Sequence, residues 1–262
     1  MGRIAEAFTT LKRDGKKGFI PYITAGDPDL ATTEQLLVTL ARHATLIELG
    51  VPFSDPMADG PVIQRASERA LKNNFGLQEI LDTAARARKR IETPIILFSY
   101  YNPLLQFGLK WLAQAANDAG IDGVLVTDLT PEESGEFEAE LRAYGLDMIF
   151  LIAPTSTDER LKLVAEHASG FIYAVSRAGV TGTRETVNAE AEKLVNRMRQ
   201  FSSLPIAVGF GISNAAQVAD VNRYADAVVV GSALVAEMER CAGEPDFVGQ
   251  IDTFLNRITG FP

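Results

Sequence analysis

Short apolar runs rich in β-branched and aromatic residues recur along the chain, separated by longer stretches with apolar residues at helical spacing. These runs predict eight strands, at Phe19–Thr24, Leu46–Leu49, Ile95–Ser99, Gly123–Val126, Met148–Ile152, Phe171–Ala174, Ile206–Gly209 and Ala227–Val230. In the stretches between them, residues such as Leu36, Leu37 and Leu40 recur at the i, i+3, i+4 spacing of one helix face. The pattern therefore predicts an alternation of strands and helices.

Such an alternation is typical of a parallel sheet. Eight units in 262 residues favour a (β/α)8 TIM barrel, because a doubly wound sheet usually has fewer strands and a G-x-G-x-x-G motif after the first. A leading amphipathic helix is predicted for residues 1–14, with Ile4, Phe8 and Leu11 on one side. No linker, low-complexity tract or short-period repeat interrupts the pattern, so residues 1–262 are expected to form a single domain.

The charge balance argues against two kinds of partner. The chain has 25 Lys and Arg residues against 34 Asp and Glu, a formal net charge of −9. A nucleic-acid backbone or an anionic membrane is bound by a basic surface, so neither is expected as a partner. No apolar stretch approaches the ~20 residues of a membrane span, and the N-terminus has no apolar signal core. A cytoplasmic location is expected.

Cysteine and histidine are scarce. The single cysteine, Cys241, excludes an intramolecular disulfide and a cysteine-rich zinc cluster, which fits a reducing compartment. The two histidines, His43 and His167, are too few for histidine-rich metal ligation. No metal site is predicted, and Ser-His-Asp chemistry is disfavoured.

Glu48 is the first candidate for chemistry, because it is the only charged residue in the apolar run Leu46–Leu49. Strand alternation places it on the same side as Leu46 and Gly50, near the carboxyl end of the strand. Loss of solvent there would raise the pKa of its carboxyl group, which suits a group that both gives and takes a proton. The alternative is a structural ion pair inside the barrel.

A long connection after the second predicted strand carries two further acids. Asp55, before Pro56, is most simply a turn residue, and Asp59 before Gly60 could equally be one. Loops after barrel strands build the face where active sites lie. A carboxylate on this loop could therefore reach a substrate held over Glu48, and Asp59 is the second candidate.

Three glycine-bearing loops follow the sixth, seventh and eighth predicted strands, at Ser176–Gly182, Gly209–Ser213 and Gly231–Ala233. Where Cβ atoms are missing, backbone N–H groups can approach an anion, and a helix that begins just afterwards adds its positive end. In barrels such a phosphate site usually follows the last two strands. The loops therefore predict a phosphorylated ligand.

The lysines restrict the reaction. Those at 72, 89, 110, 162 and 193 all fall in helix-like segments rather than near the carboxyl end of a strand, so a Schiff base is disfavoured. With few histidines for a metal aldolase, a carbon–carbon lyase would need a substrate that supplies its own electron sink. An indole ring protonated at its third carbon is such a sink, and it leaves proton transfers and charge stabilisation to the enzyme.

Four motifs are specific enough to suggest a family. They are Pro21–Pro28 (PYITAGDP), Glu48–Ala66 (ELGVPFSDPMADGPVIQRA), Ser176–Gly182 (SRAGVTG) and Gly209–Ser213 (GFGIS). With this order and spacing, the whole chain resembles the alpha-subunit family of tryptophan synthase. The resemblance implies a barrel that splits indole-3-glycerol phosphate into indole and glyceraldehyde 3-phosphate by a retro-aldol step.

The resemblance also implies roles for particular residues. Glu48 would be the acid–base group, Asp59 would accept the indole N–H bond and balance the cation, and Tyr173 would stand beside the glutamate. Packing in the barrel is an equal alternative for Tyr173. The family's phosphate-binding positions fall on Gly182, Gly211, Gly231 and Ser232, with Phe210 alongside. Its indole-binding walls fall on Tyr22, Phe98, Tyr100 and Val229, and Thr181 would close over the site and contact Asp59.

The family's partner is a beta subunit that binds pyridoxal phosphate, in an alpha2beta2 heterotetramer, so no cofactor is expected in this chain. The loop Pro52–Gly60 would lie near that partner. Three alternatives remain at this stage: a free-standing lyase that needs no beta subunit, a non-catalytic barrel that activates a partner, and a phosphate-sugar isomerase on the same fold.

Overall fold

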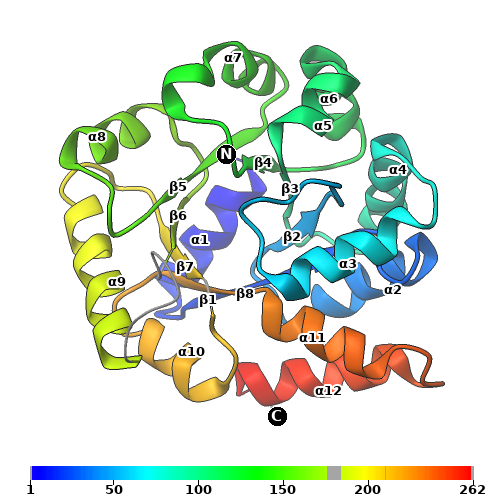
Figure 1. Cartoon of the computed structure of the whole chain (residues 1–262). Helices are drawn as coiled ribbons and strands as arrows, with labels where there is room; N and C mark the ends of the chain where they lie inside the picture. The colour runs from blue at the N-terminus through cyan, green and yellow to red at the C-terminus, as the bar shows by residue number, and fades with distance from the viewer. Residues whose placement is uncertain (1, 176–183, 210, 261–262) are drawn as a thin grey trace.

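Eight parallel strands close into a barrel in the computed structural model, which describes residues 2–175, 184–209 and 211–260 (Figure 1). The strands are β1 (Gly18–Thr24), β2 (Ile47–Gly50), β3 (Ile95–Ser99), β4 (Gly123–Val126), β5 (Asp147–Ile152), β6 (Ile172–Val175), β7 (Ile206–Gly209) and β8 (Ala227–Val230). Each strand pairs with the next along the chain, and β8 pairs with β1. The predicted (β/α)8 barrel is confirmed, and every predicted strand boundary lies within one residue of the observed one.

The helices form a ring outside the strands (Figure 1). They are α1 (Arg3–Arg13), α2 (Leu30–Leu40), α3 (Pro61–Leu71), α4 (Leu77–Arg88), α5 (Tyr101–Phe107), α6 (Leu109–Asp118), α7 (Gly135–Ala143), α8 (Asp158–His167), α9 (Arg184–Met198), α10 (Ala215–Val221), α11 (Ser232–Cys241) and α12 (Phe247–Thr259), with a short 3-10 turn at Pro131–Glu133. Local sequence sets their ends. The Asp29 carboxylate accepts the Thr32 N–H at 2.7 Å where α2 begins, and α12 stops at Gly260, whose φ is 73°.

Two apolar layers follow from the alternation of side chains along the strands. Ile47 and Leu49 of β2 face the helices, in the core between the barrel and its outer ring. Leu46 instead joins the core inside the barrel, together with Ile20, Ile96, Leu125, Ile149, Phe171, Ala207 and Ala227. Because Glu48 shares the parity of Leu46, its side chain is directed into the barrel.

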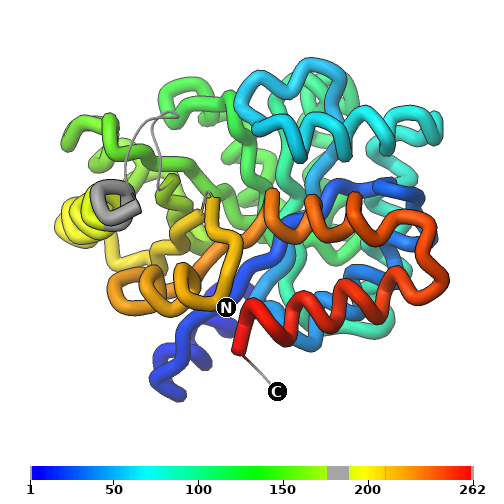
Figure 2. Tube along the Cα trace, turned by 60° about the horizontal axis from the view of Figure 1, so that its bottom comes forward, coloured from blue at the N-terminus to red at the C-terminus, as the bar shows by residue number. Residues whose placement is uncertain are grey.

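The N-terminal helix α1 closes one end of the barrel. Ile4 and Phe8 are buried in the inner core, and the Phe8 ring lies 5.9 Å from that of Phe171. Figure 2 shows α1, in blue, at the lower end of the molecule and α3, in cyan, at the upper end. The predicted leading helix is confirmed, and the accessible end of the barrel is the one at the carboxyl ends of the strands.

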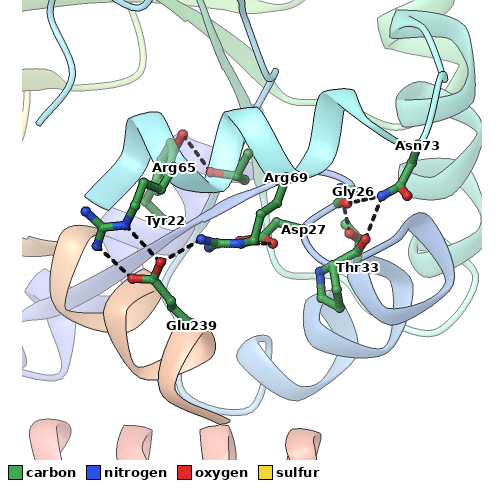
Figure 3. Close-up of polar contacts among 10 residues, drawn as sticks. Tyr22, Gly26, Asp27, Thr33, Arg65, Arg69, Asn73 and Glu239 are labelled. Atoms are coloured by element: carbon green, nitrogen blue, oxygen red, sulfur yellow. Dashed lines mark hydrogen bonds and ion pairs between the residues drawn. The ribbon is translucent and has the colours of Figure 1, made fainter. Parts of the chain in front are cut away.

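Ion pairs hold α3 against α11 and the loop that follows β1 (Figure 3). The guanidinium of Arg69 donates two hydrogen bonds to Asp27, at 2.9 and 2.7 Å, and one to Glu239 at 2.8 Å. Arg65, one helical turn earlier, also makes two hydrogen bonds with Glu239. Since α3 directly follows the loop that carries Asp59, these contacts fix the far end of that loop.

Replacing Arg69 by Met should lower the free energy of unfolding by about 2 kcal/mol, because the Asp27 carboxylate, 4% exposed, loses its cation. The value is below the loss typical of a fully buried pair, since the Arg69 side chain is 29% exposed and partly solvated. Urea unfolding measures the change. Arg65→Met is the matched control and should lower the free energy of unfolding much less. Arg65 is 48% exposed, and in this variant Glu239 still has its ion pair with Arg69. Equal losses in the two variants would rule out the role given to Asp27.

Candidate active site

A cavity of about 320 Å³ opens at the carboxyl ends of the strands. It is lined by Tyr22, Glu48, Ala58, Asp59, Gly60, Ile63, Phe98, Thr127, Leu151, Tyr173, Val175, Gly211, Val229, Gly231 and Ser232. Its size suits a small molecule, and its walls are largely apolar with a few polar groups, as in most ligand sites. Both carboxylates singled out in the sequence, Glu48 and Asp59, face this one cavity.

Glu48 lies on β2 between Tyr22 of β1 and Ile96 of β3, and it is 1% exposed. Its Oε1 atom has no hydrogen-bond partner among the described residues. Burial without a cation raises the pKa of its carboxyl group to about 8. Glu48 is therefore protonated near neutral pH. The described part of the chain shows no ion pair to Glu48, so it does not support the alternative of a structural ion pair inside the barrel.

Asp59 reaches the cavity from the loop between β2 and α3. Its backbone N–H donates to the Pro56 carbonyl at 3.1 Å, and its carbonyl accepts from Gln64 Nε2 at 2.9 Å. Burial raises the pKa of its carboxyl group to about 6, against the effect of a hydrogen bond with Tyr100. Asp59 is thus ionised at the pH where Glu48 is neutral, and two carboxyl groups in one cavity have the protonation states for two roles.

Asp55, four residues before Asp59 on the same loop, takes no part in the cavity lining among the described residues. Its side chain accepts a hydrogen bond from the Ser54 hydroxyl at 2.6 Å, and its carbonyl accepts the Met57 N–H at 2.9 Å. These are the contacts of a turn residue, which is the interpretation favoured from the sequence.

Aromatic rings form two walls of the cavity. Tyr22 packs edge-on against Phe98, with ring centroids 5.3 Å apart. Tyr173 faces them from β6, and burial together with the nearby Glu48 raises the pKa of its phenol, so its hydroxyl stays protonated. Both tyrosines need glycine neighbours: a Cβ at Gly50 would lie 2.2 Å from the Tyr22 hydroxyl, and one at Gly209 would lie 2.1 Å from that of Tyr173.

The cavity also has a side built from glycine loops. Gly211, with φ of 79°, and Gly231 line it together with Ser232, the first residue of α11. The free N–H groups of a helix's first turn attract anions, so this side suits a phosphate group. Val229, expected as part of the ring-binding wall, lines the cavity as well. Thr181, Gly182 and Phe210 lie outside the described residues.

Tyr100 is placed differently from the other wall residues. It is absent from the described cavity lining; its hydroxyl instead accepts the Ala58 N–H at 2.9 Å, on the loop that carries Asp59. Sequence reasoning also missed several lining residues: Ala58, Gly60, Ile63, Thr127, Leu151 and Val175. Strand parity could have found the last three, since each lies two residues beyond an inward-facing residue.

Across residues 2–175, 184–209 and 211–260, no group of three or more His, Cys, Asp or Glu side chains could hold a metal ion. In the same part of the chain, no helix is both long and apolar enough to cross a membrane.

The closed barrel holds a neutral buried acid and an ionised carboxylate in one cavity, and the glycine loops at its edge suit a phosphate group. These features are typical of a (β/α)8-barrel enzyme that works by acid–base chemistry. Comparison with known proteins gives the family. The family model for the tryptophan synthase alpha chain matches residues 8–255. The chain is 52% identical over 241 residues to the tryptophan synthase alpha chain of Geobacter sulfurreducens, covering 92% of this chain and 91% of that protein. It is 48% identical over 259 residues to that of Solibacter usitatus, covering 98% and 97%.

Solved structures agree. Tryptophan synthase subunit alpha from Legionella pneumophila superposes with a TM-score of 0.92 at 37% identity, covering 99% of this chain and 98% of that one. A chain of the tryptophan synthase α2β2 complex from Pyrococcus furiosus superposes with a TM-score of 0.87 at 40% identity, covering 93% and 98%. The chain belongs to the tryptophan synthase alpha chain family. It is a lyase of tryptophan biosynthesis that cleaves indole-3-glycerol phosphate, and the free-standing alternative is not favoured.

Proposed function

We propose that Glu48 and Asp59 divide the work of the retro-aldol cleavage. The observation that supports this most directly is that both carboxyl groups line one cavity, with Glu48 neutral and Asp59 ionised near pH 7. Glu48 gives its proton to the third carbon of the indole ring. The ring cation then accepts the electron pair of the breaking carbon–carbon bond. The adjacent glycerol hydroxyl gives its proton back to the Glu48 carboxylate and becomes the aldehyde of glyceraldehyde 3-phosphate.

The other groups hold the substrate in this arrangement. Asp59 accepts the indole N–H hydrogen bond, which strengthens as the ring becomes positive. Tyr22, Phe98 and Val229 contact the ring, and Tyr173 packs beside Glu48 with its hydroxyl protonated. The backbone N–H groups at Gly211, Gly231 and Ser232 bind the phosphate, together with Gly182 and Phe210, and Thr181 closes over Asp59.

A product assay tests the proposal. The purified full chain should convert indole-3-glycerol phosphate into equal amounts of indole and glyceraldehyde 3-phosphate, each measured separately. Phosphorylated sugars without the indole ring should not be processed, because they lack the electron sink. Conversion of such sugars would favour the isomerase alternative, and absence of both products would favour a non-catalytic barrel.

A beta subunit is the proposed partner, in a heterotetramer like that named for the Pyrococcus furiosus complex. Exposed apolar side chains are available to such a partner on the β2–α3 loop and the elements after it: Met57, 85% exposed, Leu71 at the end of α3, and Leu105 on α5. Leu71 lines two grooves, one with Met57, Phe53 and Pro56 and the other with Phe75, Pro103 and Phe107. We propose that pyridoxal phosphate binds to the beta subunit and that this chain binds no cofactor. We also propose that the chain is a single barrel domain and that it is located in the cytoplasm.

A further inference from the structure

We propose that Tyr100 is a positioning residue, whose hydroxyl fixes the β2–α3 loop so that the Asp59 carboxylate faces the cavity. The inference deepens the proposed function, and it rests on the role given to Asp59 there. The sequence resemblance gives Tyr100 a contact with the indole ring. The structure instead gives it the role of holding the β2–α3 loop in position.

The hydrogen bonds of the Tyr100 hydroxyl carry the argument. Tyr100 follows β3 directly and is 3% exposed. Its oxygen accepts the Ala58 N–H at 2.9 Å. The hydroxyl also interacts with the Asp59 carboxylate and opposes the rise in the pKa of that group. A phenol has one hydrogen to donate and two lone pairs. Because a backbone N–H can only donate and an ionised carboxylate can only accept, the single phenolic hydrogen goes to Asp59.

Tyr100 also contacts the start of the loop. The Phe53 ring lies 5.2 Å from the Tyr100 ring at an interplanar angle of 35°. Loop residues otherwise bond to one another or to α3: Met57 N–H to Asp55, and Asp59 N–H to Pro56. Among the described hydrogen bonds of residues 52–59, the one that joins the loop to a residue at the end of β3 is the bond from the Ala58 N–H to the Tyr100 hydroxyl.

The surroundings of Asp59 make this donor important. The titratable groups that face it are Tyr22 from β1 and Tyr100 just after β3, with Glu48 of β2 and Tyr173 of β6 in the same cavity. No Lys, Arg or His is among the described lining residues. A negative charge on Asp59 is therefore stabilised by the Tyr100 hydrogen bond rather than by a cation, and loss of that bond raises the pKa of Asp59 above its value of about 6.

The test is Tyr100→Phe in the full chain, assayed with the beta subunit present. The variant keeps the ring and its packing against Phe53 but loses the hydroxyl. We expect kcat to fall about tenfold with a smaller change in KM, because the charge of Asp59 matters most in the transition state. The acid limb of the pH–rate profile should move to higher pH by about one unit. Hydrogen exchange of the Ala58 amide should become about tenfold faster.

Tyr101→Phe is the matched control. It removes the same group from the next residue, whose side chain packs on the outer core, and it should leave all three measurements unchanged. Equal thermal midpoints exclude unfolding as the cause of the losses. An unshifted acid limb or an Ala58 amide that remains protected in Tyr100→Phe would overturn the inference. If the unaltered chain releases no indole, the proposed function fails instead, while the Ala58 exchange still tests whether Tyr100 fixes the loop.

Discussion

Replacing Glu48 by Gln should lower the rate of indole release by about 10²–10⁴-fold, the range typical of a general acid–base group. The amide keeps the size and shape of the buried side chain but has no proton to transfer at neutral pH. The folded state should change little, because the Glu48 carboxyl is held in the cavity without a cation and is neutral there. Steady-state assays of indole formation with the purified variant measure the effect.

Two controls separate chemistry from binding. Affinity for glyceraldehyde 3-phosphate, measured by calorimetry, should be nearly unchanged in Glu48→Gln, since the glycine loops lie on other strands. Glu136→Gln makes the same change at an exposed position at the start of α7 and should keep full activity. Near-normal indole release by Glu48→Gln would remove this residue from the reaction.

Replacing Asp59 by Asn should lower kcat by about 10²-fold, as expected when one preorganised group that stabilises transition-state charge is lost. Asn can still accept a hydrogen bond from the indole N–H, but it supplies no negative charge to balance the ring cation. In the unaltered chain, activity should fall as the pH drops through about 6, because the folded-state pKa of Asp59 lies there and the protonated form is inactive. The variant should lack this acid limb.

Asp55→Asn is the matched control for Asp59, because it makes the same change four residues earlier on the same loop. Asp55 contacts Ser54 at the surface and has no contact with the cavity in the described structure. Its variant should keep both the rate and the acid limb of the pH–rate profile. Similar losses in the two variants would mean that the loop tolerates no change, rather than that Asp59 has a chemical role.

The barrel could be predicted from the sequence because its strands obey a local rule. Runs such as Ile95–Ser99 and Ile206–Gly209 are β-branched, apolar and bounded by turn residues, and the structure begins and ends these strands as predicted. The same rule placed Glu48 inside the barrel, since a period of two residues leaves it on the side of Leu46. No information on distant contacts was needed for either result.

Tyr100 shows where the local rule stops. It shares the parity of Phe98, an inward-facing residue, and on an extended strand it would line the cavity as Phe98 does. The strand ladder of β3 ends at Ser99 and α5 begins at Tyr101, although the backbone of Tyr100 itself is still extended, with φ of −93° and ψ of 161°. Its ring packs against that of Phe53, and its hydroxyl accepts the N–H of Ala58, a residue 42 positions earlier.

Local pattern was therefore enough to place the strands and to predict the burial of Glu48, because both depend on side-chain periodicity within a few residues. The closed barrel was predicted from the number of strand–helix units along the whole chain. The convergence of Asp59 with Glu48, the support given by Tyr100 and the tie between Arg69 and Asp27 came from the folded chain. The Tyr100–Ala58 and Arg69–Asp27 contacts each join residues 42 positions apart, and the place of Asp59 in the cavity depends on the path of the loop that carries it. Their meeting depends on how loops and helices pack around the barrel, and no short stretch of sequence encodes that packing.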